Sequence, residues 1–344
     1  MIGDLVIPET VLSIGKNAFR NCFGLNGTLT LPNKLKVIGE AAFEGCAKMK
    51  GSIIIPDSVE KIEDYAFDSC PGFNGNLLLG EQLESIGASA FEACHGLKGD
   101  LVIPNSVIFI GNSAFKDTVG FKGILKLSNK LVTIEDFAFY RSNNLRGNLV
   151  IPDSVETIGE SAFERCSGLD GSLTLGNTVL NIGASAFKLC LKLTGEIHIP
   201  SSIKIIPAGL FERCTAFSGD LVIPDHVEVI GDGAFHGCAN LNHYLHIGAN
   251  VTSIGSLAFR DCSRLVGDLV IPSSVTSVGA NAFHRCGGFN GELKIGGNVT
   301  EIGANAFNAC AKLRGGLVIP DSVTEVGRNA FANCPRLKQI KREF

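Results

Sequence analysis

The chain has 344 residues and a formal net charge of −4, so its charge gives no reason to expect nucleic acid, which normally binds a basic surface. Hydrophobic residues make up 45% and charged residues 19%, a balance that excludes a disordered chain. No apolar run reaches the roughly 18 residues that a membrane span needs. Tryptophan is absent beside 22 Phe, 41 Gly and 12 Cys, which predicts a few residue types used at fixed positions of a repeat.

A 24-residue repeat begins at Gly3 and recurs fourteen times over residues 3–338 without insertion or deletion. Its pattern is G-x-L-x-I-P-x-x-V-x-x-I-G-x-x-A-F-x-x-C-x-x-L-x. A unit this short has too few inward positions to bury its own core, so the coils must stack on one another. We therefore predict a single solenoid domain over 1–344, with 339–344 as a C-terminal capping tail.

The first part of each repeat predicts a short strand. Leu5 and Ile7 alternate with Val6, the spacing of a strand with one face inward. Pro8 lacks an amide donor and ends the strand. Equivalent strands of successive repeats then stack in parallel, about 4.8 Å apart.

The second part of each repeat predicts the opposite face. Ala18, Phe19 and Cys22 fit one side of a short helical or 3₁₀ turn. We expect a leucine-rich-repeat-like right-handed coil, with a parallel β-sheet on one face and helical turns on the other. Its core then contains stacked phenylalanine and cysteine ladders, which begin with Phe19, Phe43, Phe67 and Phe91 and with Cys22, Cys46, Cys70 and Cys94.

All twelve cysteines occupy one column, from Cys22 to Cys334, and Thr118 and Ser142 fill its two gaps. Disulfides fit poorly because stacked side chains do not converge to the Cβ separation of about 3.8 Å that a disulfide needs. Zinc sites favour paired C-x₂₋₄-C spacings, which do not occur here. Replacement by Thr and Ser indicates a small side chain with a weak donor, suited to a turn carbonyl. We predict buried, reduced thiols and no cofactor or metal.

The outward position of the predicted strand carries aliphatic residues in about every second repeat, which suggests a 48-residue duplication that slips at the ninth repeat. An acidic column that includes Asp4, Asp100 and Asp268 runs beside it. Aliphatic rungs flanked by acids predict a surface for a protein, or alternatively a glycan. Exposed valine that reflects strand propensity alone is the other interpretation. The candidate binding residues are Val6, Val102, Val150, His198, Val222, Tyr244, His246, Val270, Lys294 and Val318.

Histidines and catalytic motifs give no sign of an enzyme. His198 and His246 are two coils apart, about 9.6 Å, too far to share a metal without another ligand. His236 and His284 recur in the turn column and are expected to be solvated. No G-x-S-x-G, phosphate-binding loop or H-E-x-x-H occurs, so a non-enzymatic protein is predicted.

The repeat resembles a known family. The I-P-x-x-V-x-x-I-G-x-x-A-F-x-x-C-x-x-L pattern, as in Ile319-Pro320 through Phe331, Cys334 and Leu337, is similar to the BspA-like leucine-rich repeats. The resemblance covers nearly the whole chain. It implies a surface protein in adhesion, or in host or matrix contact.

The two ends predict different behaviour. The first repeat starts at residue 3 without a polar cap, whereas residues 337–342 predict a charged last strand that protects its edge. Met1-Ile2-Gly3-Asp4 has no basic or apolar leader, so no signal peptide is predicted; the compartment stays open between cell surface or secretion, if a signal was removed, and cytoplasm. The leading hypothesis is an interaction module that presents its sheet face to a macromolecule. The alternative is a scaffold or filament subunit that self-associates through its first repeat.

Overall fold

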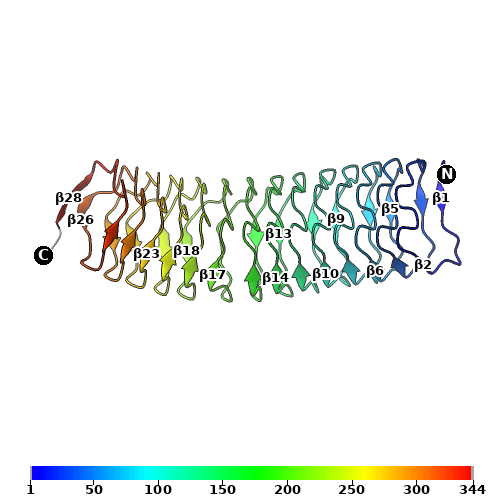
Figure 1. Ribbon diagram of the computed structural model, residues 1–344, viewed down its shortest axis with the longest axis horizontal. Helices are drawn as coiled ribbons and strands as arrows, with labels where there is room; N and C mark the ends of the chain where they lie inside the picture. The colour runs from blue at the N-terminus through cyan, green and yellow to red at the C-terminus, as the bar shows by residue number, and fades with distance from the viewer. Residues whose placement is uncertain (1, 342–344) are drawn as a thin grey trace. The chain divides into compact units, whose positions relative to one another are not determined.

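The computed structural model describes residues 2–341 and divides into two compact units, unit 1 (Met1–Gly183) and unit 2 (Ala184–Phe344). Each unit is a parallel-strand β-solenoid in which successive 24-residue repeats form successive coils. Figure 1 shows the coils of each unit stacked side by side. The solenoid expected from the repeat is confirmed.

Most coils contribute two short strands, where the sequence predicts one. In the fifth repeat, β9 (Leu101–Val102) is the expected strand, and β10 (Phe109–Ile110) is a second. The pattern of the repeat does not predict the second strand because it is only two residues long and shows no alternation. The ninth repeat lacks the first strand, and there Ile197 makes only an isolated bridge to Leu221.

The second strands form one continuous parallel sheet in each unit, eight-stranded in unit 1 and six-stranded in unit 2. The strands in unit 1 are β2 (Ser13–Ile14), β4 (Val37–Ile38), β6 (Lys61–Ile62), β8 (Ser85–Ile86), β10, β12 (Thr133–Ile134), β14 (Thr157–Ile158) and β16 (Asn181–Ile182). Those in unit 2 are β17 (Ile205–Ile206), β19 (Val229–Ile230), β21 (Ser253–Ile254), β23 (Ser277–Val278), β25 (Glu301–Ile302) and β27 (Glu325–Val326).

The first strands pair only two by two. The pairs in unit 1 are β1 (Leu5–Val6) with β3 (Leu29–Thr30), β5 (Ile53–Ile54) with β7 (Leu77–Leu78), β9 with β11 (Leu125–Lys126), and β13 (Leu149–Val150) with β15 (Leu173–Thr174). The pairs in unit 2 are β18 (Leu221–Ile223) with β20 (Leu245–Ile247), β22 (Leu269–Ile271) with β24 (Leu293–Ile295), and β26 (Gly315–Val318) with β28 (Leu337–Lys341).

This pairing has the 48-residue period seen in the sequence. The leading glycine of the first coil in each pair adopts a positive φ, whereas the leading glycine of the second coil does not. In unit 1 the positive values occur at Gly3, Gly51, Gly99 and Gly147, and in unit 2 at Gly195, Gly219, Gly267 and Gly315. Gly195 and Gly219 open consecutive repeats, so the alternation slips at the ninth repeat, where the sequence predicts it.

Phenylalanine rings form the centre of each core. In unit 1 the rings from Phe19 to Phe163 stack in sequence, with neighbouring centroids 5.0–5.4 Å apart and ring planes within 10° of each other. In unit 2 the stack runs from Phe187 to Phe331, with centroids 5.0–5.9 Å apart. Stacked pairs of this kind contribute about 0.5–1.5 kcal/mol each beyond the burial of their surface.

The predicted helical turns are wrong: among residues 2–341 no segment is helical. Two positions of every repeat adopt left-handed φ values, as Asn17 (59°) and Asn21 (57°) do in the first. A left-handed residue cannot continue a right-handed helix, so the chain turns instead. The amides of Asn17, Phe19 and Asn21 then donate to carbonyl oxygens of the next coil, over 2.7–2.8 Å. Hydrogen bonds between coils thus replace those of a helix.

Candidate functional site

The outward side chains of the first strands in unit 1 form a row that we call the first-strand face. Strand alternation buries Leu101 and exposes Val102, and the same holds for the other strands of the row. Its aliphatic members are 44–65% exposed. Each therefore offers apolar area that contact with a partner would bury. The face consists of Val6, Thr30, Ile54, Leu78, Val102, Lys126, Val150 and Thr174.

A furrow of about 360 Å³ lies on this face between β7 and β9. Within the pair of β9 and β11, Leu101 and Ile103 donate to Ile124 and Lys126 over 2.9 and 2.8 Å. In the described part of unit 1, no backbone hydrogen bond joins β7 to β9. The furrow therefore lies at a gap between strand pairs.

Glycines lie near both ends of β7. A Cβ atom at Gly75 would collide with Ser52, and one at Gly80 would collide with the carbonyl oxygen of Pro56. Because both glycines lack that atom, the coil of β7 packs closely on the coil before it. The space is left on its other side, towards β9.

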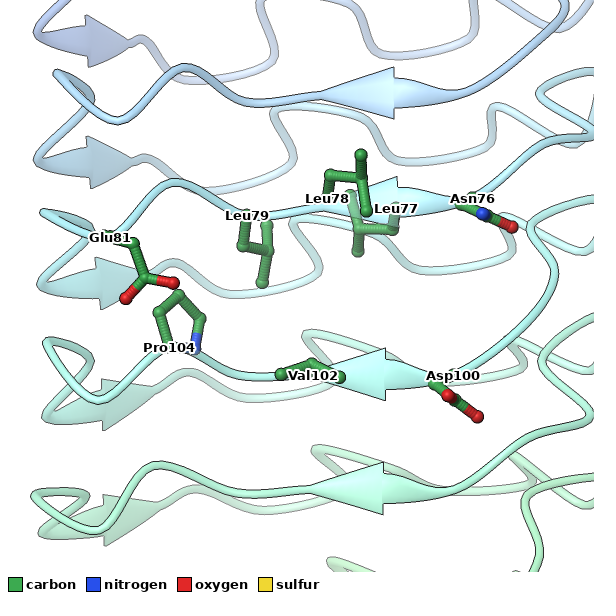
Figure 2. Close-up of a pocket in the computed structure, with 8 residues that line it drawn as sticks. All are labelled: Asn76, Leu77, Leu78, Leu79, Glu81, Asp100, Val102 and Pro104. Atoms are coloured by element: carbon green, nitrogen blue, oxygen red, sulfur yellow. The ribbon is translucent and has the colours of Figure 1, made fainter.

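Figure 2 shows the residues that line the furrow. Leu78 and Val102 stand on neighbouring coils, with Glu81 and Pro104 towards one end and Asn76 and Asp100 towards the other. Leu78 is 52% exposed, and Leu79 is half-buried. The furrow combines an apolar middle with a carboxylate at each end.

The acidic column beside the face has a structural role that the sequence reasoning missed. Three aspartates accept hydrogen bonds of 2.7–2.9 Å through Oδ1 from backbone amides of the next coil. The pairs are Asp4 with Thr28, Asp100 with Ile124, and Asp268 with Glu292. These bonds lower the pKa of Asp4 and Asp268, the latter also through Lys294. The signal was the spacing: these three aspartates stand in the first coil of their strand pairs and cap the second. Ser52 and Asn148 make the equivalent caps in two other pairs of unit 1.

The candidate residues of unit 2 lie on the equivalent strands. Val222 stands opposite His246, and Val270 stands opposite Lys294. Val318 belongs to β26 and is also exposed. His198 follows the bridge residue Ile197 and is exposed.

Tyr244 lies just before β20 and is 65% exposed. Its ring covers Gly267, where a Cβ atom would come within 2.7 Å of the ring. The amide of Tyr244 bonds to Asp220 over 3.0 Å, and His243 lies 3.8 Å from the same carboxylate. This part of unit 2 is thus more polar than the first-strand face of unit 1.

The cysteine column donates hydrogen bonds to turn carbonyls. Cys46 Sγ lies 3.1 Å from the carbonyl oxygen of Phe19, and Cys70 and Cys94 make the same bond to Phe43 and Phe67. All twelve cysteines are free thiols. Burial raises the pKa of Cys46 to about 11 and that of Cys94 to about 12, so these thiols are protonated and unreactive near neutral pH.

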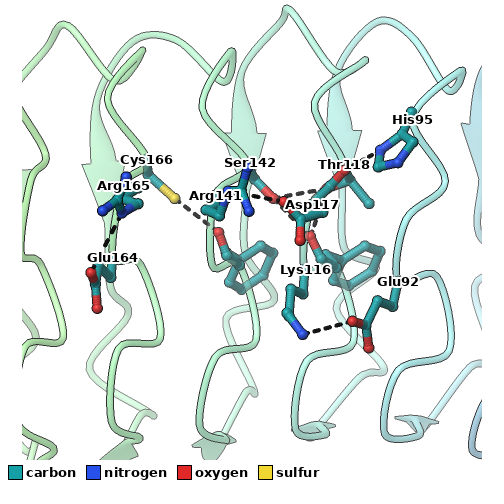
Figure 3. Close-up of polar contacts among 12 residues, drawn as sticks. Glu92, His95, Lys116, Asp117, Thr118, Arg141, Ser142, Glu164, Arg165 and Cys166 are labelled. Atoms are coloured by element: carbon teal, nitrogen blue, oxygen red, sulfur yellow. Dashed lines mark hydrogen bonds and ion pairs between the residues drawn. The ribbon is translucent and has the colours of Figure 1, made fainter.

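The two gaps in the cysteine column also hold donors, but only Ser142 reaches the carbonyl of the preceding coil. Ser142 Oγ donates to the carbonyl oxygen of Phe115 over 2.7 Å, as a cysteine would. Thr118 Oγ1 bonds to the same carbonyl and lies 2.8 Å from Ser142 Oγ (Figure 3). Among residues 2–341, no group of three His, Cys, Asp or Glu is arranged to hold a metal ion.

The expectation that His236 and His284 are solvated is wrong. The His236 side chain is only 17% exposed and lies 3.6 Å from the carboxylates of Glu212 and Asp261. His284 Nδ1 is buried without a partner, and burial followed by the charges of Arg260 and Arg285 lowers its pKa. Charged side chains of neighbouring coils lie close to both histidines.

Comparison with known protein families settles the class of repeat. The model of the BspA-type leucine-rich repeat region matches residues 1–122, 84–218, 132–266 and 219–338. The chain belongs to the BspA-type leucine-rich repeat family. Repeats of this family typically mediate protein interactions or adhesion.

Two solved leucine-rich repeat structures are similar to this BspA-type chain. A leucine-rich repeat protein from Bacteroides ovatus is 27% identical, with a TM-score of 0.78 over 98% of this chain and 86% of that one. The leucine-rich repeat protein of T. pallidum is also 27% identical, with a TM-score of 0.40 over 55% of this chain and 77% of that one. A comparison with curated proteins found no match. No helix within residues 2–341 is suited to crossing a membrane.

Proposed function

We propose that this BspA-type solenoid is a non-enzymatic interaction module and that its first-strand face contacts a protein partner. The observation that carries the proposal is Leu78, which is 52% exposed beside Val102 at the furrow. Strand propensity accounts for exposed valine or threonine, but leucine is not β-branched and gains little from that preference. Exposed aliphatic side chains that line a recess are typical of a binding surface.

The fold itself does not require aliphatic residues on this face. Thr30 and Thr174 occupy the same position on β3 and β15, and Lys126 occupies it on β11. Replacement of Val102 and Val150 by threonine should therefore leave the coils intact. This provides variants that remove apolar surface without a change of fold.

The test is capture from a panel of purified matrix and cell-surface proteins, with a glycan array alongside it. We expect the full chain to bind a protein of the panel and the Val102→Thr/Val150→Thr variant to lose that binding. The matched control is Lys61→Ser on the second strands, since Ser85 fills the equivalent position of β8. Equal capture by the face variant, or binding to glycans alone, would refute the proposal.

Self-association through the first repeat stays a prediction. Leu12 and Phe23 in that repeat are each 58% exposed. Sedimentation at rising concentration, with Phe23→Ser beside the full chain, decides between a monomer and a concentration-dependent assembly.

A further inference from the structure

The furrow between β7 and β9 differs from the equivalent place in unit 2. In unit 2, His246 stands where unit 1 has Leu78, and Lys294 Nζ lies 3.2 Å from the carboxylate of Asp268. Among the described residues of unit 1, no ion pair joins Lys126 to Asp100. The unit 1 furrow therefore keeps an apolar wall and a carboxylate without an ion-pair partner.

The middle of the furrow suits an apolar side chain. Leu78 and Leu79 form one wall, and Val102 stands on the other. The side chains of Leu78, Leu79 and Val102 offer no hydrogen-bonding group to water in the middle of the furrow. A leucine-sized side chain that displaced this water would gain the free energy of burying its apolar surface.

The ends of the furrow suit positive charge. Glu81 and Asp100 stand at opposite ends (Figure 2), and within the described part of unit 1 neither carboxylate has an ion-pair partner. Asp100 uses Oδ1 to cap Ile124, which leaves Oδ2 for a ligand. Two acids around an apolar recess attract a basic partner and repel an acidic one.

On the basis of the function proposed above, we propose that this furrow binds a protein segment in which one leucine- or isoleucine-sized side chain is flanked by Lys or Arg residues. The apolar side chain enters between Leu78 and Val102. The basic side chains reach Glu81 and Asp100. The furrow thus selects a segment whose central apolar residue has a basic residue on each side.

A random peptide library displayed on phage, panned against the full chain, tests this specificity. We expect the recovered peptides to carry an apolar residue with Lys or Arg within a few positions on each side. Leu78→Thr should reduce their binding by about tenfold or more, in line with the loss of a buried leucine contact. The Leu78→Thr variant should keep the fold, because Thr30 and Thr174 occupy the same position in other coils.

The charges are tested by Glu81→Gln with Asp100→Asn, where the asparagine keeps the amide cap as Asn148 does for Ser172. This variant should lose about threefold to tenfold in affinity for the basic peptides, an effect that added salt reproduces in the unaltered chain. Affinity for a neutral apolar peptide should not change.

The outcomes separate this inference from the proposed function. Peptides that lose binding with Val150→Thr but not with Leu78→Thr would support the first-strand face as the binding surface and would contradict the furrow proposal. Recovered peptides without basic residues, or no recovery at all, would also overturn it. Peptides whose binding is insensitive to both substitutions would contradict both the furrow proposal and the proposed function of the first-strand face.

Discussion

The thiol of Cys94 donates a hydrogen bond of 3.1 Å to the backbone carbonyl oxygen of Phe67, one coil earlier. The bond links the cysteine ladder to the phenylalanine ladder. It adds a side-chain hydrogen bond between neighbouring coils to the backbone ladders. Because both atoms are buried, the carbonyl depends on this donor.

Removing the donor should therefore cost more than changing its type. We expect Cys94→Ala to lower the free energy of unfolding by about 1–3 kcal/mol, since it leaves a buried carbonyl unpaired. Cys94→Ser should cost less, because Ser142 already makes the equivalent bond to Phe115. Urea unfolding of the two variants measures the difference, and equal midpoints would show that the thiol acts only as packing.

Alkaline pH should destabilise the fold through the buried thiols. Burial raises the pKa of Cys94 and of Cys238 to about 12 from the ordinary value of 9.0. The unfolded chain loses these protons first, so the stability contribution is full below about pH 9 and is lost as the pH rises towards 12. Each thiol contributes at most roughly 1.4 kcal/mol per pH unit in that range.

The measurement is unfolding between pH 8 and 11, with Cys238→Ser as the partner variant. The variant should show a shallower loss of stability with pH than the unaltered chain, because it has one fewer thiol to titrate. Parallel pH curves would mean that Cys238 is not protected by the fold.

The left-handed turn positions predict a stabilising glycine. Ala93 has a φ of 56°, and the same column holds Gly45 and Gly237. Ala93→Gly should raise the free energy of unfolding by about 0.5–1 kcal/mol, because glycine adopts this conformation without the steric cost. Gly237→Ala, the reverse change, should lower it by a similar amount. Thermal unfolding measures both, and a loss of stability in Ala93→Gly would contradict the account.

The acidic caps predict that charge and hydrogen bonding can be separated. Asp100→Ala removes the acceptor for the Ile124 amide and should cost about 0.5–1.5 kcal/mol. Asp100→Asn should be close to neutral, since Asn148 Oδ1 accepts the Ser172 amide over 2.9 Å. If the two variants unfold at the same urea concentration, the column is not a set of caps.

The residues at equivalent positions of successive repeats predict the core well. Each side chain in the phenylalanine column has the same neighbours above and below, so one sequence position defines a whole ladder. The replacement of cysteine by Thr118 and Ser142 likewise indicates a donor in that slot, which the bonds to Phe115 confirm. Where the chain repeats a residue for a packing reason, the sequence is sufficient to predict where that residue lies in the core.

The missed features depend on backbone conformation or on pairs of coils. Tyr65 and Phe137 adopt left-handed φ values, yet neither residue type signals this, so the turns resemble helix in the sequence. The furrow also cannot be predicted from a single repeat, because its lining comes from two coils, with Leu78 on one and Val102 on the next. Neither effect is visible in the consensus of one repeat.

Site-directed photo-crosslinking tests the central claim about the binding surface most directly. A benzophenone side chain is placed at residue 102 on β9, and in a matched protein at residue 133 on β12. We expect the protein captured by the full chain to crosslink from residue 102 and not from residue 133. Crosslinks from residue 133 alone would place the partner on the second strands and contradict the assignment of the first-strand face.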